Sequence, residues 1–132
     1  MLFGMFGAFG RKKELHMIDE GLRRHAVISS SVPESVKIAL WKRVRDRNPA
    51  PEEKEGILND LGAFLAYLCQ GHEDFSHNLD PDLANGMARR VDLAETFDES
   101  LDAETILLSL YAGLAHEDFA SRFSIEETEG EE

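Results

Sequence analysis

The sequence of 132 residues contains one cysteine, four prolines and one tryptophan. A single cysteine, Cys69, excludes an internal disulfide, so we expect a cytoplasmic protein in a reducing environment. Long apolar runs are also absent: the apolar stretch over residues 1–10 would be about 15 Å long as a helix, half the thickness of a bilayer core. The basic residues follow this stretch, whereas in a secretory signal they would precede it. We therefore expect neither a secretory signal nor a transmembrane span.

Signals for strands and for familiar catalytic sites are missing as well. There is no sustained alternation of apolar and polar residues and no Asn-Gly or Asp-Gly turn. There is also no glycine-rich phosphate loop, no Gly-x-Ser-x-Gly motif and no dinucleotide-binding fingerprint. The 26 Asp and Glu residues are so widely spread that no pair stands out as an acid–base couple. We assign no catalytic residue and no cofactor, and expect a protein that is not an enzyme.

Charge is distributed unevenly along the chain. The net charge is −12, with a balance of +4 over residues 1–54 and −16 over residues 55–132. An acidic surface repels phosphate backbones, so the C-terminal half disfavours nucleic-acid binding and favours solubility. A second hypothesis is that the acidic half mimics nucleic acid and inhibits a basic protein. The opposite charges of the two halves also allow homo-oligomers to form.

Helical periodicity predicts an all-α fold, a single bundle of about five helices over residues 12–125. Ser31 and Glu34 form the pattern of a capping box, and Asp80 followed by Pro81 has the pattern of a helix start. The last helix is the most apolar, so we expect it to lie at the centre of the bundle. The acidic residues 126–132 are expected to be a disordered tail. The helices are expected over residues 12–27, from the Ser31 cap to the residue before Asn48, from Pro51 onward, over 82–93 and over 100–123. The helix that starts at Pro51 either ends at Gly71 or runs on to Leu79 with a weak point at this glycine.

The first eleven residues form a segment with an unusual composition. Phe3, Phe6 and Phe9 each precede a glycine, and the basic residues Arg11, Lys12 and Lys13 follow. Three glycines disfavour an isolated helix, so we expect this segment to be flexible. Leaving phenylalanine in water costs about 1.5–3 kcal/mol relative to full burial, so a surface should cover these side chains. That surface is either the protein's own bundle, or a partner protein or membrane on which the segment docks.

Four potential metal ligands, Cys69, His72, Asp74 and His77, fall within nine positions. A five-residue spacing between the histidines puts them on different faces of a helix, about 140° apart, which disfavours a common metal. The alternative is that Cys69 and His72 belong to the core. His72-Glu73-Asp74-Phe75 also recurs as His116-Glu117-Asp118-Phe119, either by chance or as a trace of duplication.

A basic stretch surrounds Trp41 and could meet an anionic partner, although such residues more often cover the edge of the core. It contains Lys37, Lys42, Arg43, Arg45 and Arg47. Taken together, the sequence predicts a helical interaction or regulatory protein that docks through residues 1–11. We expect a protein partner, with peripheral membrane contact as a further possibility. The alternatives are a metal-binding helical protein or enzyme, and the acidic mimic.

Overall fold

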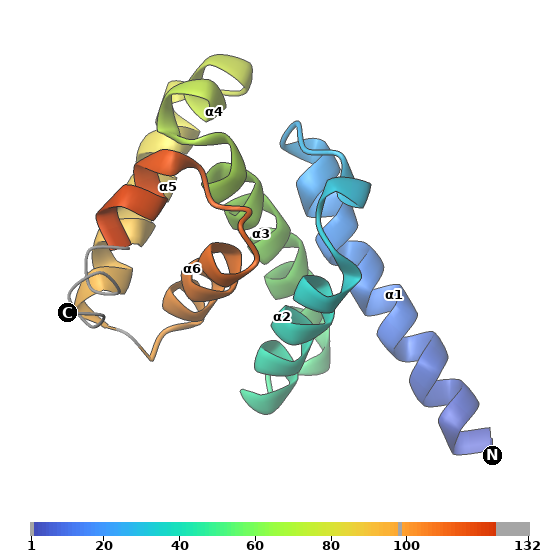
Figure 1. The fold of residues 1–132 in the computed structure, drawn as a ribbon. Coiled ribbons are helices and arrows are strands. Elements are labelled where there is room, and N and C mark those ends of the chain that lie inside the picture. Colours follow the sequence, from blue (N-terminus) through green and yellow to red (C-terminus); the bar gives the residue numbers. More distant parts are fainter. Residues whose placement is uncertain (1, 98, 124–132) are drawn as a thin grey trace.

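The computed structural model describes the backbone of residues 2–97 and 99–123, and the side chains of residues 12–97 and 99–123. The described residues contain helices and no strand, which confirms the all-α class (Figure 1). None of the helices described combines the length and apolarity that crossing a bilayer requires. The elements are α1 (Leu2–Arg24), the short 3-10 helix η1 (Ser29–Ser31), α2 (Glu34–Asp46), α3 (Pro51–Gln70), α4 (His72–Asn78), α5 (Pro81–Thr96) and α6 (Leu101–Tyr111), with a further helical segment over 117–123.

Helix α1 begins at Leu2, ten residues before the start that the sequence predicts. The backbone of the segment with the Phe-Gly triplets is therefore helical in the structure, and not a separate flexible piece. Nucleating a helix is costly, whereas extending an existing one adds a hydrogen bond for each residue fixed. Residues packed on the bundle supply the nucleus, so glycines that would prevent an isolated helix are tolerated in this extension. The expected tail over 126–132 lies outside the described residues.

Two of the predicted helix starts are confirmed. The Asp80 side chain accepts a hydrogen bond from the backbone amide of Asp82, and Ser100 accepts one from that of Ala103. The capping box at Ser31 is wrong: α2 begins after Pro33, and the Ser31 hydroxyl donates to the carbonyl of Ile28 instead. The three serines form η1, which places Ser31 too early to cap α2.

The number of helices exceeds five because glycines divide two of the expected long helices. Gly71, at φ +87°, separates α3 from α4, and Gly113, at φ +71°, lies between α6 and the helical segment over 117–123. Both angles lie in the region that favours glycine and ends a helix. The duplicated motif begins immediately after the first break and shortly after the second.

Helix α3 occupies the centre of the fold, which corrects the expectation that the last helix does (Figure 1). Residues Leu61 to Leu68 are all buried, so α3 is covered on every side over two turns. It packs against α1 on one side and against α2, α4, α5 and α6 elsewhere. Helix α6 is apolar all round but leaves Leu107 and Tyr111 exposed.

The closest approach between helices is that of α1 and α3. A Cβ atom on Gly21 would lie 2.1 Å from the carbonyl oxygen of Asn59, and one on Gly62 would lie 2.3 Å from that of Ile18. Both positions therefore require glycine, because backbone lies where a side chain would begin. Buried Leu15, Ile18 and Leu22 extend this contact along α1.

Candidate docking surfaces

The segment proposed for docking, residues 1–11, lies at the end of α1 that is remote from the bundle. In Figure 1 this end, drawn in dark blue, projects away from the other helices. The side chains of Phe3, Phe6, Phe9 and Arg11 lie outside the described residues, whereas those of Lys12 and Lys13 are exposed. Lys13 Nζ lies 3.9 Å from a carboxylate oxygen of Glu55, an exposed pair that contributes little to stability.

The four potential metal ligands are not brought together. Gly71 breaks the helix between Cys69 and His72, and Asp74 and His77 are exposed on α4. Over the residues whose side chains are described, no group of three or more His, Cys, Asp or Glu side chains is placed to hold a metal ion. Cys69 is partly buried, and this burial raises the pKa of its thiol to about 11, so the thiolate that would bind zinc or act as a nucleophile is disfavoured.

The two copies of the His-Glu-Asp-Phe motif meet at one tyrosine, Tyr67. Their phenylalanines, Phe75 and Phe119, are both buried, with ring centroids 5.2 Å and 5.4 Å from that of Tyr67. The Tyr67 hydroxyl lies 2.9 Å from His72 Nδ1. Burial, followed by the nearby carboxylate of Asp92, raises the pKa of Tyr67 to about 12. The phenylalanines of both copies therefore build the core at the end of α3, whereas the acidic residues of the motif are exposed.

The basic stretch on α2 is largely neutralised by acidic residues of other helices. Lys37 is buried and its Nζ lies 2.6 Å from a carboxylate oxygen of Asp19. Arg43 and Arg47 both pair with Glu104 of α6, at 3.2 Å and 2.7 Å. Long basic side chains here join helices, so they form little of a free anion-binding patch.

Trp41 points to the neighbouring α1, as the alternative interpretation of this stretch expects. Its indole N–H donates to the carboxylate of Glu14 at 2.7 Å. Arg45 and Lys54 lie near its ring, at 5.2 Å and 5.6 Å from the centroid. Cations held over an aromatic ring stabilise the local packing, and they occupy the face that a nucleic-acid base would need.

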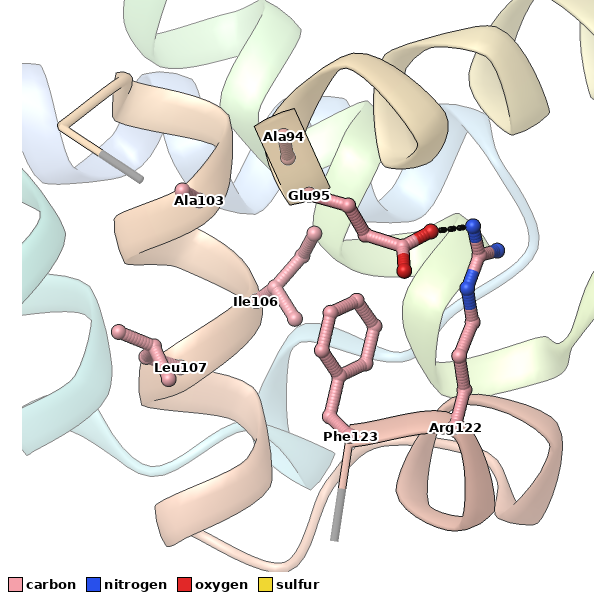
Figure 2. Close-up of a pocket in the computed structure, with 7 residues that line it drawn as sticks. All are labelled: Ala94, Glu95, Ala103, Ile106, Leu107, Arg122 and Phe123. Carbon is pink, nitrogen blue, oxygen red and sulfur yellow. Dashed lines mark ion pairs between the residues drawn. The ribbon is translucent and has the colours of Figure 1, made fainter. Parts of the chain in front are cut away.

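The structure adds an apolar groove that the sequence does not reveal, between α5, α6 and the segment over 117–123 (Figure 2). Its volume is about 340 Å³. The side chains of Ile106 and Phe123 point toward one another across it, and an ion pair between Glu95 and Arg122 closes one side (Figure 2). The lining residues are Ala94, Glu95, Ala103, Ile106, Leu107, Arg122 and Phe123.

Exposed apolar side chains concentrate on the helices that form this groove. Of six large apolar residues exposed in the described part of the chain, five belong to α5, its C-terminal end or α6, and Leu83, 37% exposed, lies near the start of α5. Leu93 is 68% exposed, Phe97 57%, Leu107 47% and Tyr111 78%. The high apolar content of residues 106–111 predicts burial, but Leu107 and Tyr111 of this stretch lie at the surface.

Comparison of the chain with protein-family models, with curated proteins and with solved structures finds no match. Two surfaces therefore define the candidate site on physical grounds alone: the end of α1 with its Phe-Gly triplets, and the apolar groove between α5 and α6.

Proposed function

We propose that this protein is a non-enzymatic helical interaction protein that docks onto a partner protein through residues 1–11. Phe3, Phe6 and Phe9 supply the apolar contact, and Arg11 with its two lysine neighbours adds electrostatic attraction. The observation that carries the proposal is the course of α1, whose first part extends away from the other helices (Figure 1). The buried residues of α1 begin only at Leu15 among those whose side chains are described.

A protein partner is favoured over a membrane by the charge of the chain. Each basic residue near an anionic bilayer contributes about 1 kcal/mol of attraction, which gives this segment roughly 3 kcal/mol from three residues. The chain as a whole carries −12, and the −16 of residues 55–132 is repelled by the same lipid surface. An apolar groove on a protein offers burial of aromatic rings without this repulsion.

The remainder of the molecule offers little that suggests catalysis. Among the side chains that the structure describes, those with shifted pKa values are Tyr67, Cys69 and Arg90, and none of them lines the groove. Tyr67 and Cys69 have raised pKa values, which hold both in the protonated, unreactive form at neutral pH. A strongly perturbed group in a cleft is a common mark of an active site, and the groove has none among the described side chains.

The test compares three forms of the full chain: the unchanged protein, a variant with Phe3→Ser, Phe6→Ser and Phe9→Ser, and a control with Ile28→Ser. Ile28 is 73% exposed and lies between the C-terminal end of α1 and η1, so the control removes an exposed apolar residue without altering the segment. Under the proposal, the three phenylalanines pack on no other part of their own chain. Thermal unfolding should then give the same Tm for all three proteins within about 3 °C, because substitutions at such positions change stability by less than about 0.5 kcal/mol.

Cross-linking capture from a lysate, followed by flotation with vesicles of neutral and anionic lipid, then shows what the segment binds. A protein retained by the unchanged chain and the Ile28 control, but lost from the triple variant, supports the proposal. Flotation that depends on the three phenylalanines would make a membrane the partner. A triple variant that unfolds many degrees earlier would place the phenylalanines in the protein's own core, and the proposal would be wrong.

A further inference from the structure

We infer that the groove between α5 and α6 receives the Phe-Gly segment of a second copy of this chain, so that copies associate head to tail. This inference rests on the proposed function and names its partner. The groove supplies an apolar floor from Ala103, Ile106 and Phe123, and Leu107 on its wall is 47% exposed. A volume of about 340 Å³ lies at the lower end of the range of roughly 300–1,000 Å³ found for ligand pockets.

Charge complementarity selects the occupant. Residues 92–123, which include the groove, contain eight Asp and Glu residues and a single basic residue, Arg122. That arginine is engaged by Glu95 and by Asp92, the latter at 2.8 Å. Residues 1–13 contain three basic residues and no acidic one. Opposite potentials on two surfaces accelerate their encounter and fix their orientation.

Basic residues of other helices cancel only part of the charge around the groove. Glu104 pairs with Arg43 and Arg47, and Asp102 pairs with Arg90. Glu99 and Glu117 are exposed, and no ion pair is formed by either carboxylate among the described residues. The part of the chain that forms the groove therefore has an excess of acidic residues, and a segment in which aromatic residues precede Arg-Lys-Lys complements both its apolar lining and its charge.

The segment cannot reach the groove of its own chain. Helix α1 is continuous from Leu2 to Arg24, and its contact with α3 at Gly21 and Gly62 fixes its direction. It carries the segment to the side of the molecule opposite α5 and α6 (Figure 1). Only another copy can bring the two together, and such a contact uses different surfaces on the two chains. Interfaces of this type form rings or open chains of copies.

The C-terminal residues 124–132 are the nearest competitor in sequence, because they follow Phe123 directly. They contain five glutamates and no basic residue, so they have none of the positive charge that residues 11–13 carry. Their only large apolar side chain is that of Ile125. As an occupant of the groove, the Phe-Gly segment is favoured over residues 124–132 because it has three phenylalanines and a positive charge.

The interface should be weak. Three phenylalanines bury roughly 450–750 Å² of their own surface, which together with the groove gives an interface at or below about 1,200 Å². Interfaces of this size are typical of transient complexes. We therefore expect a Kd in the range of about 10 µM to 1 mM, and association must be measured at high protein concentration.

The experiment is sedimentation velocity of the full chain between about 10 and 500 µM, alone and in mixtures. The segment variant carries Phe3→Ser, Phe6→Ser and Phe9→Ser, and the groove variant carries Leu107→Lys, which removes an apolar contact and adds a repelling charge. The unchanged chain should associate as concentration rises, and each variant alone should remain monomeric. Mixed at equal concentration, the two variants should form a dimer that grows no further, because each supplies one intact surface.

The matched control is Leu83→Lys, the same exchange at a 37% exposed leucine near the start of α5 and outside the groove. It should associate like the unchanged chain, and circular dichroism should show all variants folded. A chain that stays monomeric at 500 µM overturns the inference, as does a mixture that yields no dimer. In that case the proposed function is judged by the capture experiment: if the unchanged monomer captures a protein that the segment variant does not, residues 1–11 still dock on a partner, and only the assignment of a second copy as that partner is wrong. Association that is lost with Leu107→Lys but kept with the three serines gives the groove another occupant and also overturns the inference.

Discussion

Replacing Gly62 by alanine tests whether α1 and α3 touch backbone to backbone. The added Cβ would meet the carbonyl oxygen of Ile18 at 2.3 Å, where ordinary contact begins near 3.4 Å. A carbonyl oxygen cannot rotate away as a side chain can, so the two helices must separate. Overpacking typically costs about 1–3 kcal/mol, and a contact this short with backbone belongs at the upper end.

Alanine also has an intrinsic advantage over glycine inside a helix, of about 1 kcal/mol. The net expectation for Gly62→Ala is therefore a loss of roughly 2 kcal/mol in the free energy of unfolding. Gly56 provides the matched control, because it lies in the same helix and a Cβ there would have no atom within 4 Å. Gly56→Ala should raise stability by about 0.5–1 kcal/mol.

Urea unfolding followed by circular dichroism measures both variants under the same conditions, with the slope of the transition checked for two-state behaviour. The two should differ by about 3 kcal/mol, which corresponds to roughly 10 °C in Tm for a chain of this size. If Gly62→Ala is as stable as Gly56→Ala, the close approach of α1 and α3 does not exist. The direction of α1, on which both proposals depend, would then lose its physical basis.

Two further predictions concern the core around α3. Arg90→Lys should lower the free energy of unfolding by about 1–3 kcal/mol, measured by urea unfolding. The guanidinium donates two hydrogen bonds to Asp102, at 3.0 Å and 2.8 Å, which lysine cannot reproduce. An unchanged urea midpoint would refute this prediction. The free energy of unfolding should also fall as pH rises from about 9 to 12. The pKa of Cys69 is raised to about 11 and that of Tyr67 to about 12, so the unfolded state releases these two protons at lower pH than the folded state does. Tyr67→Phe should remove part of this decline in Tm measured by circular dichroism between pH 7 and 11, and an equally steep decline in the variant would contradict the assignment.

Local signals in the sequence predicted the parts of the fold that depend on local chemistry. Asp80 and Ser100 cap their helices because a side-chain oxygen needs only a backbone amide two or three residues away. Ser31 was misleading, because its hydroxyl donates to the carbonyl of Ile28 in the preceding turn and does not accept from an amide of α2. Gly71 was recognised as a weak point, but its effect depends on the positive φ that the tertiary structure imposes.

The rank of the helices within the bundle was not predictable from apolar content. Residues 106–111, in α6, are the most apolar stretch of the predicted last helix, yet α3 lies at the centre of the fold. Gly62, Ala63 and Ala66 of α3 have small or no side chains, so neighbouring helices can approach α3 closely. The apolar residues of α6 consequently remain in part at the surface. The groove lies between three consecutive segments, α5, α6 and residues 117–123, and it depends on how they pack in space, which no local sequence pattern specifies.

Ion pairs between helices neutralise part of the charge asymmetry of the sequence. Lys37 is paired with Asp19, and Arg43 and Arg47 are paired with Glu104, so the charges of these three residues are largely neutralised within the fold. The three basic residues at 11–13 belong to the projecting end of α1, whereas α5 and α6, which form the groove, lie on the opposite side of the molecule (Figure 1). Residues 92–123 hold eight acidic residues and one arginine. A molecule with opposite charges at its two ends attracts copies of itself end to end, and this attraction is screened beyond about 10 Å at 0.1 M salt. Burial of the phenylalanines is insensitive to salt, so raising the salt concentration should slow association more than it accelerates dissociation.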